Sequence, residues 1–131
     1  MAERLVAELP AAPAPVAIAL YGELGSGKTC FVQGLARGMG IARPVTSPTF
    51  ILINEYRHDR PLVHIDLYRL GGPDQVLAIG FEDYLDANAV TVVEWAERAG
   101  DLIPDRAIRV YFETGADPEQ RTVTIRSSQE R

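Results

Sequence analysis

The chain has 131 residues, with 18 acidic and 13 basic side chains and a formal net charge of −5. This length suits one domain with its own hydrophobic core and leaves little room for two, so we expect residues 1–131 to form a single domain. Hydrophobic residues make up 47% of the chain, which excludes a disordered composition. The acidic balance argues against a free-standing nucleic-acid binder, because such proteins normally present a basic face.

The single cysteine, Cys30, excludes an intrachain disulfide and a metal site built from cysteines. No apolar run approaches the roughly 18 residues that a membrane helix requires. Residues 1–4 lack the charged and then apolar layout of a signal peptide. We therefore expect a reduced, cytoplasmic protein with no membrane partner.

The first part of the chain predicts a helix, a buried strand and a second helix. Residues 3–9 form the short first helix, which the proline-rich connector 10–15 ends. Residues 16–21 (VAIALY) are a continuous apolar run, typical of a strand buried on both faces. A glycine-rich turn follows at 22–27, and apolar residues at helical spacing predict a helix over about 28–39.

The rest of the chain predicts further strands separated by short helices. Apolar or alternating runs predict strands at 50–56, 62–68, 90–95, 107–113 and 121–127. The first two and the last two of these are joined by polar turns that suit hairpins. Residues 71–75 are expected to form a break, with one or two short helical turns after it through Leu85, and a short helix is expected over 96–102. The buried strands at 16–21 and 90–95 are expected to be parallel and close neighbours.

Residues 22–29 read Gly-Glu-Leu-Gly-Ser-Gly-Lys-Thr and match the phosphate-binding pattern G-x-x-x-x-G-K-[ST] in full. Glycines let the backbone curl so that successive N–H groups point at phosphate oxygens, and the following helix adds its positive N-terminal end. Lys28 is expected to contact the β- and γ-phosphates and the Thr29 hydroxyl to bind Mg²⁺. The alternative is a chance glycine-rich turn, which the buried strand before it and the amphipathic helix after it disfavour.

These elements together predict an α/β protein with the P-loop NTPase fold. The expected architecture has three layers, with a mixed, partly parallel sheet and a C-terminal antiparallel hairpin.

Two acidic residues lie at or near the ends of predicted strands. A phosphate-binding loop needs a second carboxylate to hold Mg²⁺ or its water shell. Glu94 follows the apolar run 90–93 and fits the metal role better, because its strand is more completely apolar. Asp66 ends the alternating segment 62–66, and its expected role is to orient water or to contact Mg²⁺ through water. The alternative for each is a solvated carboxylate at the end of a strand.

Three neighbouring features each have two interpretations. His64 lies two residues before Asp66, so both side chains face the same side of a strand. They form either a polar pair near the phosphates or a separate structural histidine. Trp95 follows Glu94 and belongs either to the core or to the wall of the nucleotide pocket. The hydroxyl-rich loop 46–49 is either a segment that senses the γ-phosphate or an ordinary turn.

Taken in order, five segments resemble the TsaE (also called YjeE) family of bacterial ATPases. They are GELGSGKT (22–29), FVQGLARGMG (31–40), VTSPTF (45–50), HIDLYRL (64–70) and VEWAER (93–98). The resemblance covers most of residues 16–104. Cys30 departs from the family pattern, which commonly has a second threonine at this position.

The resemblance implies site residues, cofactors and partners. The family acts in making threonylcarbamoyladenosine, a tRNA modification beside the anticodon, together with the partners TsaB and TsaD, so tRNA contact by this chain is expected to be indirect. ATP and Mg²⁺ are the implied ligands. The residues implied to bind ATP are Glu23, Leu24, Gly25, Ser26, Gly27, Lys28, Thr29, Thr49 and Trp95; Thr29 and Glu94 are implied to bind Mg²⁺, and Lys28, Asp66 and Glu94 to act in hydrolysis.

Other nucleotide-dependent functions remain as alternatives. A small P-loop kinase needs a substrate pocket and usually an arginine-bearing lid, for which the sequence has no obvious insertion. A GTPase-like switch needs an Asn-Lys-x-Asp segment, which is absent from the sequence. A non-catalytic nucleotide-dependent binding switch stays open.

Overall fold

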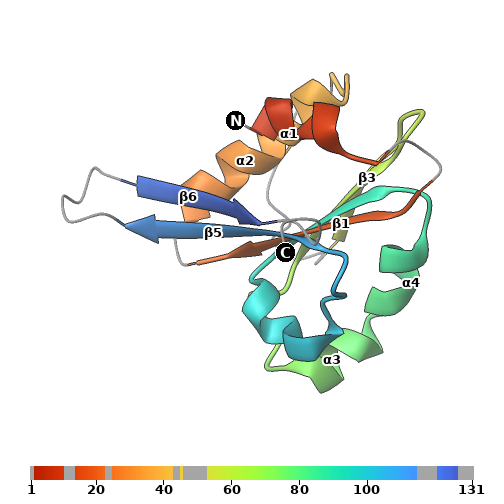
Figure 1. Ribbon diagram of the computed structural model, residues 1–131. Coiled ribbons are helices and arrows are strands. Elements are labelled where there is room, and N and C mark those ends of the chain that lie inside the picture. Colours follow the sequence, from red (N-terminus) through yellow and green to blue (C-terminus); the bar gives the residue numbers. More distant parts are fainter. Residues whose placement is uncertain are drawn as a thin grey trace.

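The computed structural model describes residues 2–10, 14–22, 25–42, 45, 53–114 and 121–126. At its centre lies a six-stranded sheet with the strand order β2-β3-β4-β1-β5-β6 (Figure 1). The strands are β1 (Val16–Tyr21), β2 (Ile53–Tyr56), β3 (Leu62–Asp66), β4 (Val90–Glu94), β5 (Ile108–Thr114) and β6 (Arg121–Arg126).

Four central strands of this sheet run parallel, and the outer two run antiparallel to their neighbours. β3, β4, β1 and β5 are the parallel strands, whereas β2 pairs antiparallel with β3 and β6 pairs antiparallel with β5. The mixed sheet and the C-terminal hairpin are therefore confirmed. The expectation that β1 and β4 are parallel neighbours is also confirmed, with Val16 opposite Val90 in the register.

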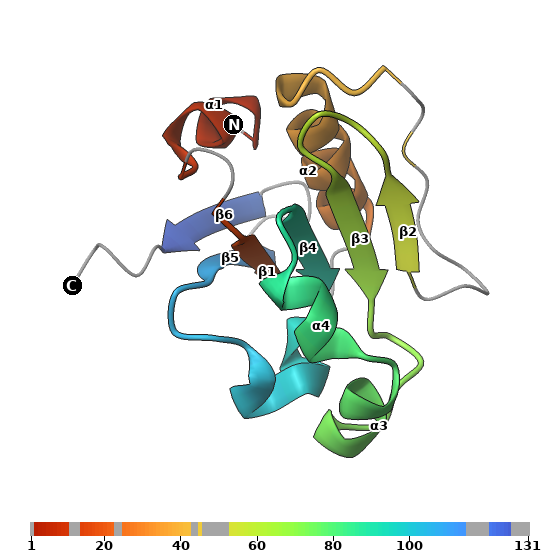
Figure 2. The same ribbon diagram turned by 90° about the vertical axis from the view of Figure 1, so that its right-hand side faces the viewer.

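Helices cover both faces of the sheet, which gives the expected three layers (Figures 1 and 2). α1 (Ala2–Glu8) and α2 (Gly25–Gly38) lie on one face. α3 (Pro73–Ala78), α4 (Phe81–Asp86) and the 3-10 helix η1 (Ala96–Leu102) lie on the other. No helix in the described part of the chain is long and apolar enough to span a membrane.

The position of strand β1 between two apolar cores explains why its sequence is a continuous apolar run. Its side chains alternate between two separate apolar cores, and both are buried. Ile18 and Leu20 pack on the side of α1 and α2, together with Leu35. Ala17 and Ala19 pack on the side of α3, α4 and η1. A strand in this central position offers a rigid support for the loop that follows it.

Several elements differ from the prediction in their limits or in their type, and β3 for example ends at Asp66, before the predicted residue 68. α2 begins at Gly25, three residues earlier than expected, so Lys28 lies inside the first turns of the helix. β4 ends at Glu94 because Trp95 has a left-handed backbone with φ 56°. The helix predicted over 96–102 is a 3-10 helix with a non-helical residue, Gly100, inside it. Residues 50–52 of the predicted strand 50–56 lie outside the described residues.

Candidate functional site

The parallel strands bring the sequence-predicted site residues to one edge of the sheet. In the register of the sheet, Glu94 lies opposite both Leu20 of β1 and Asp66 of β3. The residues after β1 enter the phosphate-binding motif at Gly22. Because the carboxyl ends of parallel strands are the usual ligand-binding edge of such a sheet, this edge is the candidate site.

Gly22 begins the phosphate-binding motif in a conformation that only glycine adopts readily. Its φ is +115°, and a Cβ atom there would lie 2.4 Å from the carbonyl oxygen of Phe112 on β5. Its backbone N–H donates a hydrogen bond to Oε2 of Glu97, at 3.0 Å. Glu97 lies in η1, two residues after Trp95 in sequence. The two halves of the site are therefore joined at this point.

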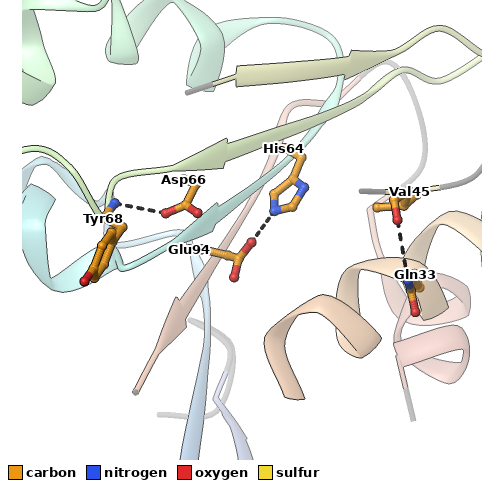
Figure 3. Close-up of polar contacts among 6 residues, drawn as sticks. All are labelled: Gln33, Val45, His64, Asp66, Tyr68 and Glu94. Carbon is orange, nitrogen blue, oxygen red and sulfur yellow. Dashed lines mark hydrogen bonds and ion pairs between the residues drawn. The ribbon is translucent and has the colours of Figure 1, made fainter. Parts of the chain in front are cut away.

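The remaining motif residues divide between described and undescribed positions. Gly25 and Ser26 begin α2, and Gly27, Lys28 and Thr29 follow in the same helix. Glu23 and Leu24 lie outside the described residues, as does Thr49 with the whole loop 46–49. The residue just before that loop, Val45, is buried, and its carbonyl oxygen accepts a hydrogen bond from Nε2 of Gln33 on α2, at 3.4 Å (Figure 3).

Lys28 is fully buried, with its ammonium nitrogen 4.1 Å from the centroid of the Trp95 ring. A cation over an aromatic face is attracted by the ring quadrupole. The Trp95 ring also contacts the ring of Tyr68, at 5.0 Å between centroids, and lies 5.6 Å from the guanidinium carbon of Arg98. Trp95 therefore packs partly against the core and at the same time lies beside the predicted phosphate-binding lysine.

The left-handed backbone of Trp95 explains this position. Such a conformation is uncommon for a bulky residue and costs of order 1–3 kcal/mol. It ends β4 and turns the chain into η1, so that Trp95 lies beside Lys28 and Glu97 reaches Gly22. Backbone strain of this kind concentrates at functional sites.

Glu94 is almost completely buried at the end of β4 and is bonded to a histidine. Its Oε2 lies 2.5 Å from Nε2 of His64 on β3, and both side chains are shielded from solvent (Figure 3). The sequence left two interpretations of His64, a polar pair with Asp66 or a structural histidine. The structure bonds His64 to Glu94, because β3 and β4 are adjacent parallel strands. Thirty residues separate the two in sequence, which hides the pair from local pattern analysis.

Asp66 is half-buried at the end of β3, and its Oδ1 accepts a hydrogen bond from the Tyr68 N–H at 2.9 Å. Burial raises the pKa of Asp66 above its ordinary value of 3.8, and the nearby charge of Glu94 adds to the increase. The hydrogen bond from Tyr68 and the charges of His64 and Lys28 oppose it without cancelling it.

The donor atoms at this edge fit a magnesium ion. Mg²⁺ prefers hard oxygen ligands and usually takes only one or two carboxylates, with waters and phosphates completing its shell. Thr29 offers a hydroxyl, and Glu94 offers a carboxylate of which His64 engages one oxygen. Within the described ranges no three His, Cys, Asp or Glu side chains form a metal-binding group. This donor set suits a metal shared with a nucleotide.

Two residues at this edge acquire a role that pattern analysis missed. Glu97 was not singled out, although an acid three residues after Glu94 was a visible signal. Its partner Gly22 lies 75 residues away, so the sequence alone could not join them. The bond from His64 to Glu94 is in neither of the two interpretations that the sequence allowed for this histidine.

Comparison with known proteins finds a family model and named relatives that this chain is similar to. A family model described as "Threonylcarbamoyl adenosine biosynthesis protein TsaE" matches residues 1–123. A protein from Treponema pallidum named tRNA threonylcarbamoyladenosine biosynthesis protein TsaE is 38% identical over 108 residues, which are 82% of this chain and 79% of the relative. Proteins of the same name from Nostoc and Bacillus subtilis are 49% and 38% identical, over 62% and 79% of this chain.

A solved structure also matches in fold. The crystal structure of YdiB from Bacillus subtilis superposes with a TM-score of 0.75 at 30% sequence identity, covering 97% of this chain and 76% of that one. The matched segments span 52% of the Nostoc relative and 65% of the Bacillus relative. This chain therefore covers between about half and four-fifths of the length of the relatives compared.

Proposed function

The chain belongs to the TsaE family, and we propose that it is an ATP-binding, Mg²⁺-dependent ATPase subunit required for threonylcarbamoyladenosine modification of tRNA. The observation that carries the proposal is the complete phosphate-binding motif between β1 and α2, with Glu94 at the end of the adjacent parallel strand. The names of the relatives support a role in threonylcarbamoyladenosine biosynthesis, and the geometry of the site supports nucleotide binding.

The phosphates of ATP would be held by the start of α2 and the loop before it. Backbone N–H groups of residues 23–28 would donate to phosphate oxygens, and the helix N-terminus would favour their negative charge. Lys28 would neutralise charge on the β- and γ-phosphates. Its buried position means that little water competes for its ammonium group, which strengthens each electrostatic contact that it makes.

Thr29 and Glu94 would hold Mg²⁺ beside these phosphates. The ion, when bound, neutralises charge that develops on the transferred phosphoryl group. Glu94 is well suited to this role because it is buried and fixed by His64, so its position is set before the nucleotide arrives.

Asp66 would orient the attacking water and accept its proton. The Tyr68 N–H fixes one of its oxygens, and burial raises its pKa above the ordinary value, which makes the carboxylate a stronger base. Trp95 would border the nucleotide, since its ring already contacts Lys28.

We expect the isolated chain to hydrolyse ATP slowly and to need TsaB- and TsaD-like partners for useful turnover. Phosphoryl transfer without an added arginine or similar cation is slow, and such a group can come from a partner. The net charge of −5 also suggests that the partners make most of the contact with tRNA.

A reconstitution tests this proposal. TsaB, TsaD, ATP, Mg²⁺ and a threonylcarbamoyl donor are incubated with unmodified tRNA, with the wild-type chain, with Lys28→Ala, or without either. The expected result is multiple-turnover modification with the wild-type chain only. Equal modification in all three reactions contradicts the proposal, and rapid ATP-dependent phosphorylation of a small metabolite by the chain alone would point to a kinase instead.

A further inference from the structure

His64 is a polar side chain buried in the middle of the sheet. Its exposed fraction is 0%, and it lies opposite Val92 in the pairing of β3 with β4. Both flanking residues of β3, Val63 and Ile65, are buried and apolar. Burying an imidazole in such surroundings costs free energy unless its nitrogens are hydrogen-bonded.

The imidazole ring has one polar contact in the described structure, and it is to the predicted metal ligand. Nε2 lies 2.5 Å from Oε2 of Glu94, whereas Nδ1 is buried without a hydrogen-bond partner among the described residues. Since an ionised carboxylate can only accept, Nε2 is the donor of this hydrogen bond. Among the described residues, the bond to Glu94 is therefore the one hydrogen bond that fixes the orientation of the ring.

This arrangement is a poor way to gain stability. Two buried polar side chains that bond to each other recover little more than their desolvation cost, and apolar residues of similar volume often stabilise a core better. A glutamate has three rotatable side-chain bonds, however, and a fixed donor holds it in one rotamer. The bond between the two side chains therefore serves to orient the Glu94 carboxylate (Figure 3).

We infer that His64 is a positioning residue that holds Glu94 for Mg²⁺ by binding Oε2 and directing the other carboxylate oxygen to the metal. This inference rests on the proposed function, because it takes Glu94 as the magnesium ligand. In this role His64 belongs to the nucleotide site although it does not contact ATP. Its loss weakens the metal-dependent part of nucleotide binding and spares the metal-independent part.

A pair of amide substitutions separates this role from a structural one. The side-chain nitrogen of glutamine reaches the place of Nε2 and still donates to Glu94, whereas the shorter asparagine does not. His64→Gln and His64→Asn both place an amide side chain at the same buried position, so their costs to packing are comparable. His64→Leu removes the donor and fills its place with an apolar side chain. Thr91→Val is the control, because Thr91 is equally buried on β4 but bonds to the Tyr84 carbonyl.

The measurement is ATP binding followed by the emission of Trp95, the only tryptophan in the chain, with Mg²⁺ varied and with Mg²⁺ removed by EDTA. We expect His64→Asn and His64→Leu to raise the half-saturating Mg²⁺ concentration roughly tenfold, as loss of a group that orients a metal ligand commonly does. Metal-free ATP affinity should stay within about twofold, and His64→Gln should retain most of the wild-type Mg²⁺ dependence. Thermal melts confirm that each variant is folded.

Two results would overturn the inference. One is an unchanged Mg²⁺ dependence in both His64→Asn and His64→Leu. The other is a parallel loss of metal-free and metal-dependent binding, which Thr91→Val reproduces at equal loss of stability. If His64→Leu does not fold, the comparison of His64→Gln with His64→Asn decides. If the wild-type chain itself shows no Mg²⁺-dependent binding of ATP, the proposed function fails, and this inference fails with it.

Discussion

The ammonium nitrogen of Lys28 lies 4.1 Å from the centre of the Trp95 ring. The backbone of Trp95 itself is in the left-handed region, with φ 56°. A contact of this kind contributes about 0.5–2 kcal/mol. Charge-assisted hydrogen bonds to two phosphates are stronger than this, so we expect Lys28 to exchange the ring for phosphate when ATP binds. The strained residue after β4 and the charged residue after β1 thus meet at one point.

Loss of the Glu94 carboxylate should change the Mg²⁺ dependence of ATP hydrolysis, whereas loss of the Asp66 carboxylate should change its rate. We expect Glu94→Gln to raise the Mg²⁺ concentration needed for half-maximal ATP hydrolysis at least tenfold, because it removes a metal ligand's charge. Asp66→Asn should leave that concentration nearly unchanged and lower kcat by about 10²-fold or more, as expected on loss of a general base. Steady-state kinetics over a range of Mg²⁺ concentrations measures both quantities. The opposite pattern would exchange the two assignments.

The raised pKa of Asp66 predicts how its removal affects stability with pH. Because the pKa is higher in the folded chain than the ordinary 3.8, ionisation of Asp66 destabilises the folded state as pH rises from about 4 through the folded-state pKa. Asp66→Asn should therefore melt at a higher temperature than the wild-type chain at pH 7. This difference should shrink toward zero as the pH falls below about 4, where Asp66 is protonated in both states.

Thermal melts of the two proteins between pH 4 and pH 8 test this prediction. Asp105→Asn, which removes a carboxylate from an exposed position, serves as the control and should change the melting temperature little. A lower melting temperature for Asp66→Asn at pH 7 would show that the Asp66 carboxylate stabilises the fold, contrary to the prediction.

The hydrogen bond from Gly22 to Glu97 should prepare the phosphate-binding loop for its ligand. We expect Glu97→Ala to weaken ATP binding roughly three- to tenfold, since a hydrogen bond to a charged group at a solvent-exposed position contributes modestly. Glu97→Gln keeps an oxygen acceptor and should bind within about twofold of the wild-type chain. Equal losses in the two variants would indicate that the charge of Glu97, and not its hydrogen bond, is what matters.

Gly22 itself should not tolerate a side chain. Alanine there would place Cβ 2.4 Å from the Phe112 carbonyl oxygen and require a positive φ, so we expect Gly22→Ala to lower the free energy of unfolding by at least about 2 kcal/mol. Gly72→Ala is the matched control, because no atom lies within 4 Å of a Cβ at that position. It should cost less than about 1 kcal/mol by urea denaturation. Equal costs for the two substitutions would contradict the close approach at Gly22.

Local patterns in the sequence predicted the elements around the site. The glycine-rich motif does lie between the buried strand β1 and helix α2, and the apolar run of β4 does end in a buried carboxylate, Glu94, whereas the binding of phosphate stays a prediction. Each pattern lies within about ten residues, where strand burial and glycine conformation leave a direct mark. The mixed sheet followed from the same reasoning, because short polar turns predict hairpins.

The contacts that organise the site were not predictable in this way. His64 meets Glu94 because of the parallel register of β3 and β4, and Glu97 meets Gly22 because Trp95 turns the chain. Such long-range contacts depend on strand order and on one unusual backbone angle. Neither leaves a periodic signal in the sequence. The roles of Glu23, Leu24 and Thr49 remain predictions, since these residues lie outside the described ranges.

The most direct test of the central claim is a calorimetric titration of ATP with Mg²⁺ into the wild-type chain, Lys28→Ala and Arg37→Ala. Arg37 lies on the same helix but at its exposed end, paired with Glu3, so its loss controls for a reduced positive charge. We predict saturable binding by the wild-type chain, affinity lowered at least about thirtyfold in Lys28→Ala, and a change of no more than about twofold in Arg37→Ala. Equal affinities of Lys28→Ala and the wild-type chain would contradict the assignment of residues 22–29 as a phosphate-binding loop.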